Sequence, residues 1–427
     1  MDVHIALPLL AGLSPAQFMR RHWQKKPLLV RGAIAGFKPL LSRAELFRLA
    51  ASEDVESRLI VKNIDTTGDD AHDAWHMKSG PFPRRSLPPI SQADWTLLVQ
   101  GVDGHHPSVH QFLQQFRFVP DARLDDVMIS FATPGGGVGP HFDSYDVFLF
   151  QASGRRRWKI GQQKDLTLQS GVPLKILQKF EPDQEFVLEA GDMLYLPPRY
   201  AHDGIAAPDP DGTAPDCVTY SIGFKAPAQT ELAAELLHKL AEFSEDAGDD
   251  SDSDADADAD LTRKRAKKMY RDAAQAATDR PAELPAALLA FAADAVSQAL
   301  KDPLAVACAL GETVTAPKAR VWFEQTGNDW DGLAGMVKGQ SLRLDAKSRM
   351  MYDAHHLFIN GESYRAKGSD AKLMRLLADQ RALPAAALAR ASAGAQQLLA
   401  DWHAQGWVHL TAPTPEGVNR DNERRNT

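Results

Sequence analysis

The sequence predicts an α+β protein with a β-rich domain, then a helical segment, then a smaller mixed domain. Short apolar runs separated by glycine and proline turns continue to about residue 227. Composition then becomes rich in alanine and leucine over residues 228–302, and a β-hairpin signal lies among helical patterns in 303–412. Because 427 residues are too many for one ordinary domain, we expect these three units and a flexible tail over 413–427.

The first unit, residues 1–227, carries the strongest strand signals. Several runs are apolar on both faces, as strands inside a sandwich or barrel are. Ser14 is the expected N-cap of an opening helix, with Pro15 at its first position. The expected strands cover residues 127–131, 146–150, 158–160, 185–188, 193–196 and 218–222.

The middle unit predicts two helices, over 230–243 and 285–301. Leu232, Leu236, Leu237 and Leu240 form an apolar face with little else in the sequence to cover it, so we expect a homodimer. Between the helices, residues 245–260 hold nine acidic side chains and no basic ones, which predicts a disordered loop.

Charge argues against a nucleic-acid binder. The net charge of −8 would be about +1 without the nine acidic residues of the loop, so the folded remainder is nearly neutral. We interpret the basic run 263–268 as a solvated helix face, in preference to an RNA contact.

The third unit predicts a winged-helix-like module. Asn360-Gly361 is a type I′ turn signal between strands at 357–359 and 363–365, with 350–352 as a further strand. Ser369 is expected to cap one helix, another helix ends before Gly406, and residues 407–410 form a closing strand. Twelve basic residues stand against ten acidic ones, so we expect protein contacts and no direct DNA binding.

The sequence predicts a cytoplasmic protein. No apolar run approaches the roughly 20 residues of a membrane span, and the N-terminus shows no secretory signal. Cys217 and Cys308 are the two cysteines, which fits a reducing compartment and excludes a thiolate metal site.

His141, Asp143 and His202 form the candidate metal site. In a strand, His141 and Asp143 would share one face, and an antiparallel strand ending at His202 could return beside them. Two imidazoles and one carboxylate on one side of a mononuclear Fe(II) leave the opposite side open. The glycine-rich turn before His141 would allow close backbone approach.

Arg156 is the candidate co-substrate residue. Period-2 alternation places it with Trp158 and Ile160 on the inward face of a strand, with Arg155 and Arg157 outward. A buried arginine needs an anionic partner, which a dicarboxylate such as 2-oxoglutarate would supply. An internal Asp or Glu is the alternative partner.

The sequence resembles the JmjC-type cupin oxygenases, most closely the bacterial ribosomal oxygenase branch. The resemblance rests on WQKKPL (23–28), PGGGVGPHFDSYDVF (134–148), GRRRW (154–158), LPPRYAH (196–202) and YSIGF (220–224). It implies a double-stranded β-helix (jelly-roll) domain, a helical dimerisation segment and a winged-helix-like C-terminal domain. It also assigns iron to His141, Asp143 and His202, and the distal 2-oxoglutarate carboxylate to Arg156.

The resemblance implies a dioxygenase that uses Fe(II), 2-oxoglutarate and O2 to hydroxylate an arginine of large-subunit ribosomal protein L sixteen. Tyr145 and Asp146 are candidates for holding the substrate guanidinium, although both could simply pack within the sheet. Three alternatives stay open: the same chemistry on a histidine of another ribosomal protein, a ligand-sensing winged-helix regulator, and a demethylase of methylated lysine.

Overall fold

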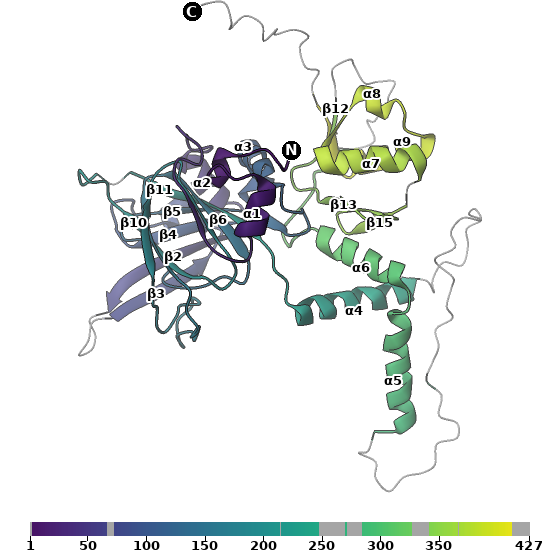
Figure 1. Cartoon of the computed structure of the whole chain (residues 1–427), viewed down its shortest axis with the longest axis horizontal. Coiled ribbons are helices and arrows are strands. Elements are labelled where there is room, and N and C mark those ends of the chain that lie inside the picture. The colour runs from purple at the N-terminus through teal and green to yellow at the C-terminus, as the bar shows by residue number, and fades with distance from the viewer. Residues whose placement is uncertain are drawn as a thin grey trace, which may run out of the picture. The chain divides into compact units, whose positions relative to one another are not determined.

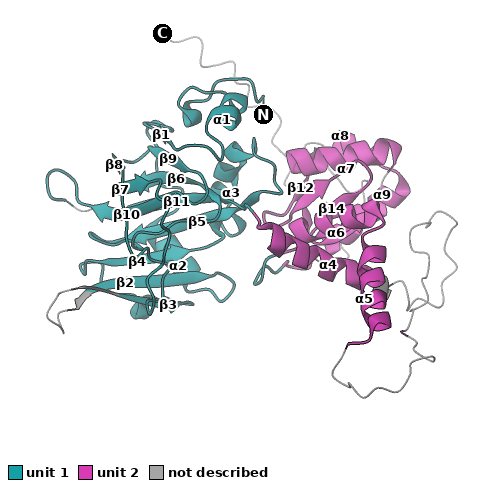
Figure 2. Cartoon of the chain, turned by 60° about the horizontal axis from the view of Figure 1, so that its bottom comes forward, with its two compact units in different colours: residues 1–226, 318–322 teal, residues 227–317, 323–427 magenta. Residues whose placement is uncertain are grey.

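Two compact units make up the chain, residues 1–226 with 318–322 and residues 227–317 with 323–427 (Figure 2). The computed structural model describes residues 2–65, 72–213, 215–246, 270, 284–326, 341–365 and 367–411. Most of the expected acidic loop, from residue 247 on, lies outside the described residues, as do the basic run 263–268 and the tail 413–427. The boundary expected between 228–302 and 303–412 stays a prediction, because both stretches fall in the second unit.

Two antiparallel sheets form the first unit (Figure 1). The larger has the order β1-β9-β6-β11-β5-β4-β2-β3, and the smaller has the order β10-β7-β8. Because the chain passes back and forth between the sheets from β6 to β11, the domain is a double-stranded β-helix, which confirms the expected jelly roll. The strands are β1 (Leu28–Val30), β2 (Ser57–Asp65), β3 (His72–Ser79), β4 (Trp95–Val99), β5 (Leu124–Ala132), β6 (Asp146–Ser153), β7 (Arg155–Gly161), β8 (Gln184–Leu188), β9 (Met193–Leu196), β10 (Ala201–Ala207) and β11 (Cys217–Phe224).

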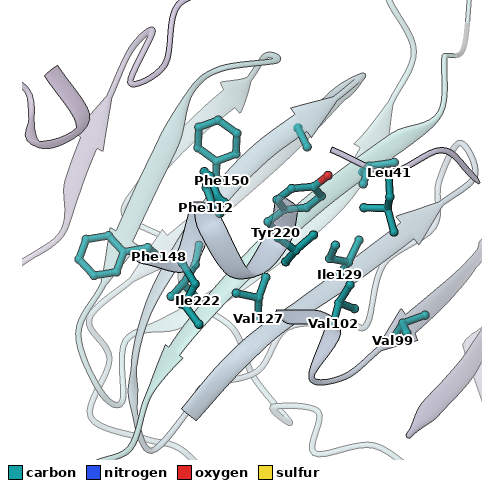
Figure 3. Close-up of a cluster of buried hydrophobic side chains, with 14 of the residues drawn as sticks. Leu41, Val99, Val102, Phe112, Val127, Ile129, Phe148, Phe150, Tyr220 and Ile222 are labelled. Carbon is teal, nitrogen blue, oxygen red and sulfur yellow. The ribbon is translucent and has the colours of Figure 1, made fainter. Parts of the chain in front are cut away.

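Every residue of β11 is buried, because the larger sheet is covered on both faces. On one face, Tyr220 and Phe150 pack against Phe112 of helix α3 (Pro107–Leu113), and Figure 3 shows these rings in one cluster. On the other face, alternate residues point toward the smaller sheet, where Cys217 contacts Ala206 of β10. The space between the sheets is where the candidate site residues lie.

Helices cover the outer face of the larger sheet. The expected start of α1 (Pro15–Arg21) is confirmed: Ser14 accepts from the Gln17 N–H, and the Gln17 side chain accepts from the Ser14 N–H. The other helices of this unit are α2 (Arg43–Ala50), capped in the same way by Ser42, and the 3-10 helices Pro8–Leu10, Arg84–Ser86, Val102–Gly104 and Gln114–Phe116.

The second unit begins with three helices and continues into a winged-helix-like module. Asn360 and Gly361 have φ of 50° and 89°, and Ile359 pairs with Glu362, which confirms the predicted type I′ turn. The prediction that Ser369 caps a helix is wrong. Lys367 is the N-cap of α7, because the helix already begins at Gly368. The elements are α4 (Gln229–Asp246), α5 (Ala286–Ala299), α6 (Pro303–Thr315), α7 (Gly368–Gln380), α8 (Ala385–Leu388), α9 (Ala393–Ala404), β12 (Ser341–Leu344), β13 (Met350–Tyr352), β14 (Leu357–Ile359), β15 (Glu362–Tyr364), β16 (Ala382–Pro384) and β17 (Val408–Leu410).

Among the helices described, none combines the length and the apolar character that crossing a membrane requires.

Candidate functional site

The structure brings His141, Asp143 and His202 together. One potential ligand atom from each lies within 4.8 Å of the others. His202 Nε2 is 3.6 Å from Asp143 Oδ2, and the two imidazole centroids are 4.2 Å apart. Within the described residues, no other group of His, Cys, Asp and Glu side chains meets this criterion.

The way the chain holds these residues differs from the expectation of two regular strands. His141 forms an isolated bridge with His202: each main-chain N–H donates to the other's carbonyl, at 2.9 and 2.8 Å. Asp143 lies beyond this bridge in the loop before β6, and its carbonyl accepts from the Arg199 N–H at 2.7 Å. His202 lies near the start of β10, whereas we expected it at a strand end. The turn that contains Pro197 and Pro198 separates β9 from β10, so His202 belongs to a new strand.

Both imidazoles have their Nδ1 atoms engaged by main-chain carbonyls. His141 Nδ1 lies 2.9 Å from the Gly139 oxygen, and His202 Nδ1 lies 2.9 Å from the Tyr200 oxygen. Because a carbonyl can only accept, Nδ1 carries the hydrogen in each ring and the Nε2 lone pair faces the cluster. Burial, followed by repulsion from His141, lowers the pKa of His202 to about 4, so this ring is neutral at physiological pH.

Close backbone approach explains the glycines that frame the site. A Cβ on Gly137 would lie 2.7 Å from the Gly204 oxygen, and one on Gly139 would lie 3.0 Å from a side-chain atom of Ile176. Gly139 also has φ of 78°, which L side chains rarely adopt. The turn before His141 therefore admits little besides glycine at these two positions.

Arg156 lies inside the jelly roll, as its period-2 placement predicted. It is only 4% exposed, Trp158 and Ile160 are buried with it, and Arg157 is exposed. Its Nε and Nη2 atoms have no hydrogen-bond partner among the described residues. Since a buried guanidinium without partners is costly, this arrangement suits an anion that the chain itself does not provide.

An aromatic ring links Arg156 to the metal-ligand candidates. The guanidinium carbon lies 5.7 Å from the centroid of the Trp158 ring, which is itself 5.8 Å from the His202 ring. Gly204 pairs with Trp158 in the smaller sheet, and a Cβ on Gly204 would lie 2.5 Å from that ring. Gly204 therefore makes room for the indole.

Sequence reasoning missed the polar side chains on the facing sheet. They are fully or almost fully buried, and Thr96 Oγ1 has no hydrogen-bond partner among the described residues. The available signal was polar residues at alternate positions within otherwise apolar strands. These residues are Thr96, Ser130, Gln151 and Thr219.

Asp146, a predicted substrate contact, has its carboxylate fully engaged within the protein. Oδ1 accepts from the Tyr195 hydroxyl at 2.6 Å, and Oδ2 accepts from Gln24 at 3.0 Å and from Arg123 at 3.2 Å. Burial raises the pKa of Asp146, against these three partners, which lower it. These hydrogen bonds give Asp146 a structural role within the protein. Its contact with substrate stays a prediction.

Tyr145 is half-buried at the edge of the ligand cluster. Burial, followed by the charge of Asp143, raises the pKa of its hydroxyl, so the group is neutral throughout the physiological range. Its ring lies alongside Gly223, at a distance of 3.7 Å from a Cβ built there. This position is compatible with the predicted substrate contact, which no contact in the structure tests.

Two domain families match this chain. A JmjC domain matches residues 111–232, and a ROXA-like winged helix matches residues 298–409. Residues 111–232 therefore contain a JmjC domain of jelly-roll fold and residues 298–409 a winged helix, and the expected resemblance is confirmed.

Its relatives include ribosomal oxygenases. The ribosomal protein uL16 3-hydroxylase of Escherichia coli is 38% identical over 218 residues, or 50% of this chain and 53% of that protein. A probable ribosomal oxygenase of Haemophilus influenzae is 33% identical, covering 52% of each chain. A bifunctional lysine-specific demethylase and histidyl-hydroxylase NO66 of Drosophila persimilis is 28% identical over 47% of this chain and 29% of that one. The chain thus aligns with about half the length of the first two relatives.

Solved structures match over nearly the whole chain. The structure of E. coli ribosomal oxygenase YcfD in complex with cobalt and 2-oxoglutarate has a TM-score of 0.69 and 27% identity. It covers 94% of this chain and 99% of that one. The X-ray structure of E. coli ycfD gives a TM-score of 0.73 over 93% and 98% of the two chains.

Proposed function

We propose that this protein is an Fe(II)- and 2-oxoglutarate-dependent oxygenase that hydroxylates an arginine side chain of ribosomal protein uL16, the L sixteen protein of the sequence resemblance. One observation carries the proposal: two Nε2 lone pairs and a carboxylate converge beside a buried arginine whose N–H groups lack a partner.

The ligand set fits iron. His141 and His202 would each supply Nε2, and Asp143 would supply one carboxylate oxygen. Two imidazoles and a carboxylate on one side of an ion are typical of non-haem Fe(II) oxygenases, which need open positions for co-substrate and oxygen. The YcfD structure in complex with cobalt and 2-oxoglutarate supports the proposal of a metal-binding protein.

Arg156 fits the far carboxylate of 2-oxoglutarate. A bidentate pair with a carboxylate would engage the N–H groups that are now without partners. The side-chain alternative, an internal Asp or Glu, finds no support, because the structure records no ion pair for Arg156 within the described residues. Trp158 would then line the path between the carboxylate and His202.

The protein's contribution is positioning and exclusion of water. Fe(II) and 2-oxoglutarate supply oxygen activation and oxidation of a substrate C–H bond when they are bound. The carbonyls of Gly139 and Tyr200 hold both imidazoles in the ligating tautomer. An apolar cluster that includes Val147, Leu149 and Ile160 keeps water from the closed end of the site.

The substrate assignment rests on the relatives. Identity is 38% to the uL16 3-hydroxylase and 28% to the histidyl-hydroxylase NO66, so we favour uL16 over a histidine in another ribosomal protein. Tyr145 and Asp146 remain our proposed substrate contacts, with Tyr145 the better placed. We also propose a cytoplasmic location and no direct DNA binding.

We further propose a homodimer through the middle helices. Of the four leucines on which the dimer prediction rested, Leu240 is buried within the chain and Leu237 is 42% exposed. Helix α5 has no buried residue, and it exposes Leu288, Leu289 and Val296 at 37%, 54% and 50%. A face this apolar is typical of a subunit interface. Light scattering should give twice the chain mass, and Leu289→Glu should give a monomer. A monomeric parent protein would refute the dimer.

The direct test is anaerobic reconstitution with Fe(II) and 2-oxoglutarate, followed by addition of oxygen and ribosomal proteins. Intact-mass analysis should show one added oxygen on uL16, and fragmentation should place it on an arginine. Modification of a histidine in another protein would favour the alternative substrate. Salt-dependent binding to random duplex DNA, without hydroxylation, would favour the winged-helix regulator.

A further inference from the structure

Arg199 has a main-chain conformation that does not suit arginine. The Tyr200 N–H donates to the Pro197 oxygen at 3.3 Å, which closes a β-turn with Pro198 and Arg199 at its centre. Arg199 has φ of 62°, and proline cannot take a positive φ, so the turn is of type II. Its third position favours glycine or asparagine, and the turn therefore does not explain an arginine there.

Arg199 is attached to both segments that carry metal-ligand candidates. It lies three residues before His202, and its N–H donates to the Asp143 carbonyl at 2.7 Å. Its guanidinium carbon lies 5.9 Å from the centroid of the Phe142 ring, which comes between His141 and Asp143. The main chain of Arg199 is therefore held next to Asp143, and its side chain lies near Phe142.

The Arg199 side chain is exposed on a turn that is bonded to the Asp143 main chain. The Asp143 side chain is 23% exposed, His141 is also partly exposed, and the His202 side chain is only 3% exposed, so solvent reaches the ligands from the side of His141 and Asp143. Arg199 is exposed, and the structure records no hydrogen bond or ion pair to its guanidinium among the described residues. A substrate side chain that enters from this solvent-exposed side would come near the Arg199 turn.

We propose that Arg199 is a specificity-determining residue that binds an oxygen acceptor of the substrate polypeptide, next to the side chain that enters the site. The inference rests on the proposed function, since it concerns the substrate of the same oxygenase. The contact with the Phe142 ring uses none of the guanidinium N–H groups as conventional hydrogen-bond donors, so they are available for a main-chain carbonyl or a carboxylate.

The test compares Arg199→Gly with Arg157→Gly, a matched loss of an exposed arginine on the outward face of β7. Glycine suits the turn and keeps the N–H bond to Asp143, so the Arg199 variant should fold. With a uL16 peptide as substrate, Arg199→Gly should raise KM by roughly 10- to 100-fold, the range expected for a lost charged hydrogen bond, and keep kcat within about twofold. Arg157→Gly should change neither value.

Further measurements separate the possible outcomes. An unchanged KM in Arg199→Gly overturns the proposal, and so does a loss of cobalt affinity, which would mean that Arg199 acts only through Asp143. A defect seen with ribosomal particles but absent with the peptide would assign Arg199 to RNA and would also overturn it. A KM ratio that shrinks with salt identifies a carboxylate acceptor, and a constant ratio identifies a carbonyl. If the parent protein does not oxidise any uL16 substrate, the proposed function itself fails.

Discussion

His202 Nε2 lies 3.6 Å from Asp143 Oδ2, although 58 residues separate the two side chains in the sequence. The main-chain bridge between His141 and His202 produces this proximity, because it joins the glycine-rich turn to the start of β10. The geometry of the candidate metal site therefore depends on two hydrogen bonds of the backbone as well as on the ligands.

Replacing His202 should abolish metal binding. In His202→Ala, one of three ligand atoms is lost, and we expect the affinity for Co(II) to fall by at least about 100-fold. Anaerobic titration followed by visible absorption would measure it. His76→Ala, an exposed histidine of the same unit, is the control. Unaltered Co(II) affinity in His202→Ala would remove this residue from the ligand set.

Replacing Arg156 should not lower the stability of the protein alone, but it should remove the stabilisation by bound 2-oxoglutarate. Arg156→Met removes a buried charge that lacks partners, so the melting temperature without ligand should stay the same or rise. The increase in melting temperature on adding 2-oxoglutarate should disappear, and KM for 2-oxoglutarate should rise by roughly 10- to 100-fold. Retained stabilisation by 2-oxoglutarate would place its carboxylate elsewhere.

Gly204→Ala should disturb the site through Trp158. The new Cβ would lie 2.5 Å from the indole, so the ring or β10 must move. Overpacking of this kind costs about 2 kcal/mol of unfolding free energy, and KM for 2-oxoglutarate should rise as the ring shifts under Arg156. Gly394→Ala is the control, since its Cβ meets nothing closer than 3.9 Å, and it should be neutral or slightly stabilising. Equal melting temperatures for both variants would contradict the predicted clash.

Asp103 should make the first unit less stable as pH rises. Burial, followed by repulsion from Asp126, raises the pKa of Asp103 to about 6, against the hydrogen bond from the Val127 N–H. The native state then keeps a proton that the unfolded chain releases near pH 4, so the free energy of unfolding falls between about pH 4 and pH 6.

Asp103→Asn should remove that dependence. Because Asp103 keeps partial contact with solvent, we expect a gain on the order of 1 kcal/mol at pH 8 and little change at pH 4. Urea unfolding at both pH values would measure it, with exposed Asp54→Asn as the control. A gain that is equal at both pH values would exclude titration of Asp103 as its cause.

Local patterns in the sequence predicted some features well. Alternation alone placed Arg156 on the inward face of β7, because side chains in a strand repeat every two residues. Asn360-Gly361 predicted its turn because both residues accept a positive φ.

The strand expected for His141 and Asp143 was wrong, and the reason is not local. Asp143 gives its carbonyl to Arg199, a residue of a distant turn, so strand pairing stops after His141. Thr96 and Gly204 were missed for a similar reason. Their importance comes from neighbours elsewhere in the fold, which are Gly136 in the turn after β5 for Thr96 and Trp158 on β7 for Gly204. The metal and co-substrate roles of the site residues remain predictions.

The carbonyls that orient the two histidines belong to Gly139 and Tyr200, and every amino acid carries the same carbonyl. A point mutation at Tyr200 changes its phenol but cannot delete the acceptor beneath His202. Most single substitutions should therefore leave the tautomer of each imidazole unchanged. Only substitutions that distort the turns at Gly139 and Tyr200 would change these tautomers. Residues at the edge of the site, such as Arg199, can therefore vary while the tautomers of the two histidines are preserved.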